Sequence, residues 1–481
     1  MKHLSLCLSL LVFAAMACSP FSTTGADDGA KRPNIVFIIS DDQCFDAIGA
    51  LGHEQLQTPN LDRMVRSGLT FTHAYNMGSW SPAVCIPSRA MLNTGRFLWR
   101  AEAVYQRSEQ ERQAGRLWSL MIQSAGYDTY MTGKWHVRAN AERSFDFVTN
   151  VRPGMPNQTP EGYNRPIEGQ PDAWSPYDAR FEGFWRGGKH WSEVLADDAE
   201  AFFEQAAERD NPFFMYLAFN APHDPRQSPK SYVERYPLED VELPANFLPE
   251  YPYNEAMGSG RGLRDERLAP FPRTEFAVKT NIQEYLAIIS HMDTQVGRIL
   301  DALQRTGKAD QTYVIFTSDH GLAVGQHGLM GKQNMYDHSM RVPLIVMGPD
   351  IPKDQRVDGD VYFQDVVPTT LEWAGVDVPD FVEFRSLMPI VRGQRERNYD
   401  AIYGAYLHRQ RMIRQDGYKL ILYPTIGRVR LFHVQSDPAE TIDLADDPKH
   451  QSTVKRLFAS LLKLQQEMGD SLDLQAAFPD L

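Results

Sequence analysis

The segment Cys85-Ile86-Pro87-Ser88-Arg89 holds the residues with the most distinctive chemistry in this chain. Cys85 and Arg89 stand one helical turn apart, and Pro87 favours the start of a helix at this point. Two interpretations compete. Cys85 is either a functional sulfur beside a permanent cation or a small apolar core residue, which is the commoner role of a free cysteine.

The small number of cysteines favours the functional interpretation. Residues 1–17 have the pattern of an export signal, with Lys2 near the start, an apolar run to Met16, and small residues before Cys18. After removal of this signal only Cys44 and Cys85 certainly remain. An exported protein with so few cysteines has no disulfide framework, so a bridge does not explain Cys85.

Further polar groups directly follow short apolar runs rich in β-branched and aromatic residues. The runs at 35–39, 127–131, 213–219, 313–317 and 344–347 are predicted to be buried parallel strands. Helical patterns separate many of them, at 59–67, 117–124 and 192–208. Strands that alternate with helices predict an α/β fold with a large, mostly parallel sheet flanked by helices.

The polar groups at the strand ends are Asp41-Asp42, Gly133-Lys134-Trp135-His136, Ala221-Pro222-His223 and Asp319-His320-Gly321. In open α/β sheets, ligand sites form in the crevice outside the carboxyl ends of the strands. We therefore expect these four separate segments to converge on one place.

Three aspartates in this set predict a metal site. Asp41 and Asp42 are adjacent and would repel each other without a nearby cation. With Asp319 from another strand end, the oxygen-rich set favours one Ca²⁺ per chain. His320 complicates this prediction, because imidazole suits transition metals better than Ca²⁺.

A second set of residues is basic, and shared placement makes it more informative than any member alone. It consists of Arg89, Lys134, His136, His223 and Lys332. Such cations could neutralise an anionic substrate, and a histidine or lysine could transfer a proton.

Together these motifs resemble the formylglycine-dependent (type I) sulfatases of the alkaline phosphatase-like superfamily. The resemblance rests on Cys85 to Arg89, on Gly133 to His136, on Ala221-Pro222-His223 and on Gly331-Lys332, all in family order. It extends from Pro33-Asn34-Ile35 through Arg341-Val342-Pro343 to Asp437-Pro438-Ala439-Glu440. The histidine at 320 is similar to that of some carbohydrate sulfatases, whereas most of the family has asparagine there.

The resemblance implies that Cys85 is oxidised to formylglycine (3-oxoalanine) by a formylglycine-generating or an anaerobic sulfatase-maturating enzyme. The hydrated aldehyde would bind the metal and attack the sulfur of a sulfate ester. The metal ligands implied are Asp41, Asp42, Cys85, Asp319 and His320.

The resemblance also implies roles for the basic residues. Arg89 would hold the aldehyde hydrate and the carboxylates, while Lys134 and Lys332 would neutralise sulfate oxygens. Either Lys332 or His223 would protonate the leaving alcohol, and His136 would take the proton that lets sulfate leave. Backbone N–H groups near Pro87 are expected to point at the sulfate.

The chain is expected to have four parts. They are a signal peptide (1–17), a tether (18–31), a catalytic α/β domain (32–382) and a C-terminal α+β subdomain (383–481). In the last part, short antiparallel strands at 401–406, 411–414, 418–423 and 429–434 precede a closing helix at 452–468, and Asp416-Gly417 predicts a hairpin turn.

A basic and aromatic cluster beside the long loop at 152–189 is a candidate sugar-binding surface. It comprises Arg186, Lys189, His190 and Trp191. Such side chains suit stacking on a sugar ring and pairing with anionic groups. A solvated loop explains the cluster equally well.

The net charge of the chain limits the classes of molecule that it could bind. The formal net charge of −13 argues against nucleic acid, so an anionic substrate needs a local basic pocket. We expect an exported sulfatase that acts on a sulfated carbohydrate, periplasmic, secreted or anchored to the cell surface by a lipid on Cys18. The alternatives are a phosphonate or phosphate ester hydrolase and an inactive glycan-binding homologue. The sequence leaves open the sugar, the sulfate position, endo or exo action and the oligomeric state.

Overall fold

The computed structural model describes residues 32–481. The predicted signal peptide, the tether and Cys18 lie outside this range. Residues 33–481 form one compact unit. None of the described helices combines the length and the apolar character that a membrane crossing requires.

The central sheet has eight strands in the order β11-β2-β10-β8-β1-β7-β5-β6. Their bounds are β1 Asn34–Ser40, β2 Leu69–Phe71, β5 Asp128–Lys134, β6 Phe147–Arg152, β7 Phe213–Ala218, β8 Thr312–Ser318, β10 Leu344–Met347 and β11 Gln355–Val357. β1 pairs in parallel with β7 on one side and β8 on the other. The predicted α/β fold with a mostly parallel sheet is confirmed.

The parallel direction predicted for residues 344–347 is wrong. β10 is antiparallel to both β8 and β2, and Leu344 pairs with Thr317 near the carboxyl end of β8. The chain therefore enters β10 at the edge of the sheet where β8 ends, and it runs back. An apolar run in the sequence indicates a strand that is buried on both faces of a sheet, but it does not indicate the direction of that strand.

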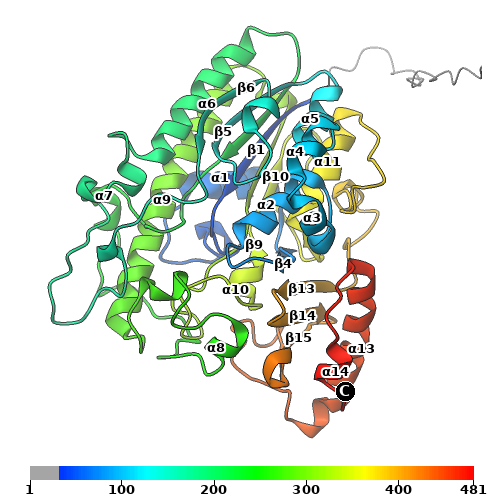
Figure 1. Ribbon diagram of the computed structural model, residues 1–481. Helices are drawn as coiled ribbons and strands as arrows, with labels where there is room; N and C mark the ends of the chain where they lie inside the picture. Colours follow the sequence, from blue (N-terminus) through cyan, green and yellow to red (C-terminus); the bar gives the residue numbers. More distant parts are fainter. Residues whose placement is uncertain (1–31) are drawn as a thin grey trace, which may run out of the picture. The chain divides into compact units, whose positions relative to one another are not determined.

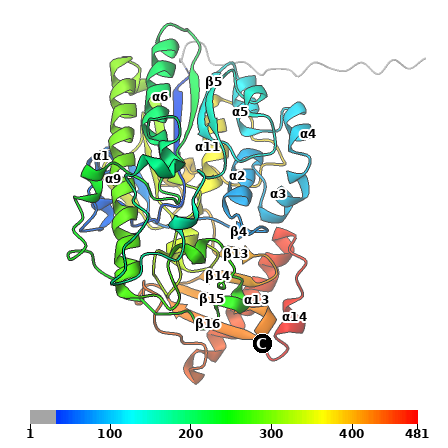
Figure 2. The ribbon, with the colours of Figure 1, turned by 60° about the vertical axis from the view of Figure 1, so that its left-hand side comes forward.

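Helices cover both faces of this sheet (Figures 1 and 2). Alternate residues of β1 separate the two cores, since Ile35, Phe37 and Ile39 belong to one apolar cluster and Val36 and Ile38 to the other. The first cluster includes α5 (Trp118–Ser124) and α11 (Val366–Ala374). The second includes α1 (Pro59–Ser67), α6 (Trp191–Ala207) and α9 (Glu275–Arg305).

The remaining helices and short strands lie between these elements or after them. The helices are α2 Cys85–Thr94, α3 Leu98–Tyr105, α4 Ser108–Gln113, α7 Lys230–Val233, α8 Asn254–Met257, α10 Asp337–Met340, α12 Met388–Val391, α13 Gln451–Met468 and α14 Leu474–Ala477. The strands β3 (Ala74–Tyr75), β9 (Arg341–Val342) and β12 (Val361–Tyr362) form a separate small sheet.

The C-terminal sheet has the order β16-β15-β14-β13-β4. Its antiparallel strands are β13 Ile402–Tyr406, β14 Gln410–Gln415, β15 Tyr418–Tyr423 and β16 Arg428–His433. Asp416 and Gly417 form the turn between β14 and β15 with positive φ angles, as a two-residue hairpin requires. The predicted boundary at 382/383 stays a prediction.

The fifth strand of this sheet, β4 (Gly78–Ser79), comes from far upstream and pairs in parallel with β13. A Cβ at Gly78 would lie 1.9 Å from the carbonyl oxygen of Ala405, so the close approach requires glycine. This pairing fixes the segment that leads into α2 to the C-terminal part of the chain.

A buried charged triad makes a second connection between the C-terminal sheet and the rest of the chain. Lys419 Nζ on β15 lies 2.5 Å from Asp337 Oδ1 on α10 and 2.7 Å from Glu440 Oε1. Glu440 also accepts a hydrogen bond from the Asp337 N–H at 2.7 Å. Burial raises the pKa of Glu440 to about 7.

We expect Lys419→Met to lower the free energy of unfolding by roughly 3–5 kcal/mol, because it removes the cation that both buried carboxylates share and leaves Asp337 only its longer contact with Arg341 at 3.7 Å. Denaturant unfolding measures the loss. Arg428→Met on neighbouring β16 is the control, since Arg428 pairs with Asp443 and Asp446 near solvent and should contribute less than about 1 kcal/mol. Equal losses in the two variants would contradict the expectation.

Candidate active site

The four strands that carry the candidate groups are neighbours, in the order β8-β1-β7-β5. Their carboxyl ends therefore lie side by side, and they bring Asp319, Asp41, His223 and Lys134 to one edge of the sheet. The loops are also bonded to one another: the Asp41 N–H donates to the Ala221 carbonyl at 3.0 Å, and the Asp319 N–H donates to the Ser40 carbonyl at 3.3 Å. The predicted convergence is what the structure shows.

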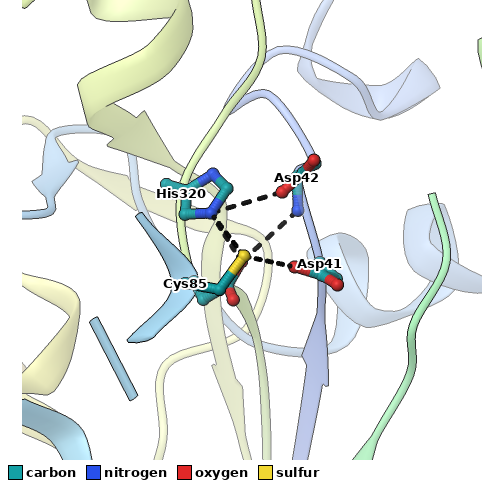
Figure 3. Close-up of side chains that lie close together, drawn as sticks. Asp41, Asp42, Cys85 and His320 are labelled. Atoms are coloured by element: carbon teal, nitrogen blue, oxygen red, sulfur yellow. Dashed lines mark hydrogen bonds and ion pairs between the residues drawn. The ribbon is translucent and has the colours of Figure 1, made fainter. Parts of the chain in front are cut away.

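Five possible metal-ligating side chains gather at this edge. Single donor atoms of Asp41, Asp42, Cys85, Asp319 and His320 all lie within 4.8 Å of one another, and all five residues are buried. Cys85 Sγ lies 3.4 Å from Asp41 Oδ1 and 3.3 Å from His320 Nε2 (Figure 3). Three carboxylates, an imidazole and a sulfur are compatible with a divalent metal ion.

Asp42 contacts the residues that follow β8 through both its backbone and its side chain. Its φ of 73° is left-handed, a conformation that aspartate adopts more readily than most residues. The Asp42 N–H donates to Asp319 Oδ1 at 3.3 Å, and Asp42 Oδ1 lies 3.2 Å from His320 Nε2. The turn after β1 thus directs this carboxylate at the residues that follow β8.

Each of the three aspartates contacts its own cation. Lys134 Nζ lies 2.5 Å from Asp41 Oδ2, and Arg89 Nε lies 3.0 Å from Asp319 Oδ2. Lys332 Nζ lies 2.8 and 2.7 Å from the two oxygens of Asp42 and 3.5 Å from Cys85 Sγ. Cations from three distant parts of the chain therefore surround the sulfur.

These charges act strongly on Cys85 and Asp41. Burial raises the pKa of the Cys85 thiol, but Lys134, Lys332 and His320 outweigh burial and hold the pKa well below its usual range. Burial, Asp319 and Cys85 together raise the pKa of Asp41 well above its usual range, although Lys134 opposes them. Negative charge is therefore crowded at Asp41, and a bound divalent cation would relieve that crowding.

The start of α2 offers fewer free donors than expected. The Ile86 N–H donates to the Ala83 carbonyl at 3.0 Å, and the Ser88 N–H donates to the Val84 carbonyl at 3.3 Å. Pro87 has no N–H. The expectation that N–H groups near Pro87 bind the sulfate is corrected for these positions, because the turn before the helix already uses those donors.

The two candidate histidines differ in exposure. His136 is half-buried, and burial lowers the pKa of its imidazole although the nearby Cys85 opposes this shift. His223 is buried, with Nε2 3.8 Å from Asp42 Oδ2. Its Nδ1 lies 2.8 Å from the Asp224 carbonyl oxygen and 3.2 Å from Asp224 Oδ1. His136 therefore lies on the more open side of the site, and His223 lies deeper.

The cluster proposed from sequence to bind sugar lies in a different environment. His190 is fully buried, with Nε2 3.0 Å from the Gln227 carbonyl oxygen and its ring stacked on Phe184. Trp191 is buried beneath the guanidinium of Arg152. These two side chains pack in the core, which corrects the expectation that they contact sugar. Arg186 and Lys189 are exposed, and Lys189 pairs with Asp197.

Sequence reasoning missed a group of residues around the two candidate proton donors. They are Asp224, Arg264, Asp265 and Gln333, which are linked by ion pairs and hydrogen bonds. Asp224 and Gln333 directly follow His223 and Lys332, so adjacency was an available signal. Arg264 and Asp265 lie in a long aperiodic segment and gave none.

Two family models match this chain. The model described as sulfatase matches residues 33–376, and the model described as N-sulphoglucosamine sulphohydrolase, C-terminal, matches residues 325–467. The chain is 24% identical to the N-acetylglucosamine-6-O-sulfatase of Bacteroides thetaiotaomicron, with 96% of this chain and 91% of the relative covered. It is 27% identical to an arylsulfatase of Clostridium perfringens, with 90% and 94% covered.

Solved structures share the fold. A protein in complex with its substrate D-glucosamine-2-N,6-O-disulfate superposes with a TM-score of 0.72 at 24% identity, covering 92% of this chain and 99% of the other. A phosphonate monoester hydrolase from Silicibacter pomeroyi also gives 0.72, at 22% identity, covering 92% and 96%. The matching family model spans the strand ends and the residues gathered around Cys85, and the chain therefore belongs to the sulfatase family of the alkaline phosphatase-like superfamily and is a sulfuric ester hydrolase.

Proposed function

We propose that this protein is a calcium-dependent sulfatase that uses a formylglycine at position 85 and hydrolyses sulfate esters of a carbohydrate. The observation that carries the proposal is the position of Cys85 Sγ, within 4.8 Å of carboxylate and imidazole ligand atoms from two strand ends. The same sulfur lies 3.5 Å from Lys332 Nζ. An attacking group at residue 85 would therefore lie in a buried, cation-rich environment.

The donor set fits the proposed cofactors. Asp41, Asp42 and Asp319 supply the oxygen ligands that Ca²⁺ prefers, with His320 and residue 85 beside them. When bound, Ca²⁺ would stabilise negative charge on sulfate oxygens, and the hydrated aldehyde would supply the attacking hydroxyl. Arg89 fixes Asp319, and it also donates to the Lys134 carbonyl at 2.9 Å, so it holds a ligand and a cation in one arrangement.

The remaining residues address the two difficulties of sulfate ester hydrolysis. The ester is anionic and repels nucleophiles, so Lys134, which pairs with Asp41, and Lys332, which lies 3.5 Å from Cys85 Sγ, would neutralise its oxygens. The alcohol leaves poorly unless it is protonated, and His223 or Lys332 donates that proton. His136, whose imidazole is influenced by the nearby Cys85, would accept the proton from the hydroxyl at residue 85 when sulfate is released.

Two observations support a carbohydrate substrate. Relatives include an N-acetylglucosamine-6-O-sulfatase, and a structural neighbour was solved with a sulfated glucosamine. The formal net charge of −13 means that the surface as a whole repels sulfated polymers, so the local cations must outweigh it.

A product-resolved screen tests the proposal. Protein coexpressed with a maturating enzyme is incubated with defined sulfated oligosaccharides, 4-nitrophenyl sulfate and a 4-nitrophenyl phosphonate. We expect inorganic sulfate and a desulfated sugar from at least one oligosaccharide. Faster turnover of the phosphonate than of every sulfate would favour the phosphonate hydrolase alternative. Binding of sugars without any turnover by the mature protein would favour a glycan-binding protein.

We also propose that the protein is exported. The support is the small-residue pattern Ala15-Met16-Ala17 before Cys18. The mature chain from its native cell is expected to begin at Cys18, with a diacylglycerol on that cysteine if a lipoprotein signal peptidase cleaves it. N-terminal peptide mass spectrometry measures both outcomes, and an intact Met1 would contradict export.

A further inference from the structure

One partly exposed arginine contacts two carboxylates at once. Arg264 Nη1 pairs with Asp224, its Nη2 lies 3.3 Å from Asp224 Oδ1, and Nη2 also lies 2.5 Å from Asp265 Oδ1. The side chain of Arg264 is 33% exposed, whereas both carboxylates are buried. The planar guanidinium suits such a bridge, because its donors form a rigid fork.

The first carboxylate leads to His223. Asp224 Oδ1 and the Asp224 carbonyl oxygen both face His223 Nδ1, at 3.2 and 2.8 Å. The opposite ring nitrogen, Nε2, points at Asp42 Oδ2 at 3.8 Å. Asp224 therefore fixes the rotation of the imidazole and directs Nε2 into the site, as a carboxylate commonly does for a functional histidine.

The second carboxylate leads to Lys332. Asp265 Oδ2 accepts a hydrogen bond from Gln333 Nε2 at 2.8 Å, and Gln333 Oε1 accepts one from the Lys332 N–H at 3.0 Å. Gln333 Nε2 also donates to the Pro82 carbonyl at 2.9 Å, just upstream of Cys85. Gln333 is therefore held between the backbone of Lys332 and the segment that leads into α2.

We infer that Arg264 is a positioning residue, which holds the two candidate proton donors, His223 and Lys332, in place through Asp224 on one side and Asp265 with Gln333 on the other. This inference rests on the proposed sulfatase reaction. These contacts would hold the proton donor close to the alcohol oxygen while the S–O bond breaks. As the S–O bond to the alcohol breaks, its electron pair stays on the alcohol oxygen, and a proton from Nε2 or Nζ neutralises that oxygen.

A positioning role predicts a dependence on the leaving group that a purely structural role does not. An acidic phenol leaves without much help, whereas a weakly acidic one needs the proton. We compare turnover of 4-nitrophenyl sulfate with that of unsubstituted phenyl sulfate, which has almost the same size. Arg264→Met is expected to lower the turnover of phenyl sulfate by about 10- to 100-fold and the turnover of 4-nitrophenyl sulfate by only a few fold. Arg264→Lys should rescue only part of this loss, since an ammonium ion cannot bridge both carboxylates equally.

Two further variants separate the branches. Asp224→Asn weakens the contacts of Asp224 with His223 and Arg264 and leaves Asp265 and Gln333 in place. Gln333→Met removes the link to Lys332 together with the hydrogen bond to the Pro82 carbonyl, and it leaves Asp224 and His223 in place. If Asp224→Asn raises the ratio of 4-nitrophenyl sulfate turnover to phenyl sulfate turnover more than Gln333→Met does, His223 is the proton donor. If Gln333→Met raises this ratio more, Lys332 is the proton donor. These variants keep the test valid if Arg264→Met fails to fold.

Arg411→Met is the matched control, because Arg411 pairs with Asp470 in a buried ion pair of the C-terminal sheet. It should lower the melting temperature and leave the ratio of the two turnover rates unchanged. An unchanged ratio in Arg264→Met, Asp224→Asn and Gln333→Met would overturn the inference. Failure of the mature wild-type protein to release sulfate from both aryl sulfates and from every defined sulfated oligosaccharide would instead overturn the proposed function.

Discussion

Replacement of Cys85 by alanine is expected to abolish sulfate ester turnover, by at least about 10⁴-fold, while the protein stays folded. The side chain is 3% exposed and small, so its removal leaves a minor cavity, but it takes away the only proposed source of the attacking hydroxyl. Turnover of 4-nitrophenyl sulfate and thermal unfolding measure the two effects. A Cys85→Ala protein that completes many turnovers would overturn the mechanism.

Cys44, the second buried cysteine among residues 32–481, provides the control. Burial raises the pKa of the Cys44 thiol to about 12, and its sulfur donates to the Leu322 carbonyl at 2.9 Å, so Cys44 is an unreactive structural residue. Cys44→Ser should stay active. After coexpression with the maturating enzyme, a hydrazide probe should label residue 85 and not residue 44. An active wild type in which Cys85 is wholly unmodified thiol would exclude formylglycine.

Loss of one aspartate from the Cys85 site should lower metal content and turnover together. Asp41→Ala and Asp319→Asn each remove a carboxylate from the five-residue cluster and leave Lys134 or Arg89 without its partner. We expect turnover to fall by at least about 100-fold. Bound calcium, measured by elemental analysis of desalted protein, should fall from one ion per chain to near zero.

Asp365→Asn is the matched control, since Asp365 is equally buried but is held by Asn398 and Tyr399 at 2.8 and 2.9 Å, away from the cluster. That variant should keep its calcium even if it loses stability. Chelation followed by readdition gives an independent measurement. Full activity in exhaustively chelated protein would exclude the metal, and recovery with Zn²⁺ but not Ca²⁺ would contradict calcium and favour a transition metal, which imidazole suits better.

The gathering of the site could be predicted because it depends on a simple rule. Asp41, Lys134, His223 and Asp319 each stand at or just beyond the end of an apolar run, and parallel strands bring such ends to one edge. It was enough to recognise these apolar runs as parallel strands. The order of the four strands was not needed.

Other features depend on information that a local pattern lacks. The direction of β10 follows from the path of the chain between residues 319 and 343, not from the apolar run itself. The burial of His190 depends on Phe184 and His291, which pack against its ring from other elements. The double contact of Arg264 joins an aperiodic loop to two distant segments, so only the folded chain reveals it.

Because β4 pairs with β13, the segment before α2 has to wait during synthesis until its partner strand has been made. Gly78 and Cys85 leave the ribosome long before Ala405, and at about 5–20 residues per second the delay is on the order of tens of seconds. Until then the strand that leads into α2 has no neighbour in the C-terminal sheet. In the folded chain Cys85 is buried. The proposed conversion of Cys85 to formylglycine would therefore be expected before the chain closes around this residue, so slower synthesis should raise the converted fraction and faster folding should lower it.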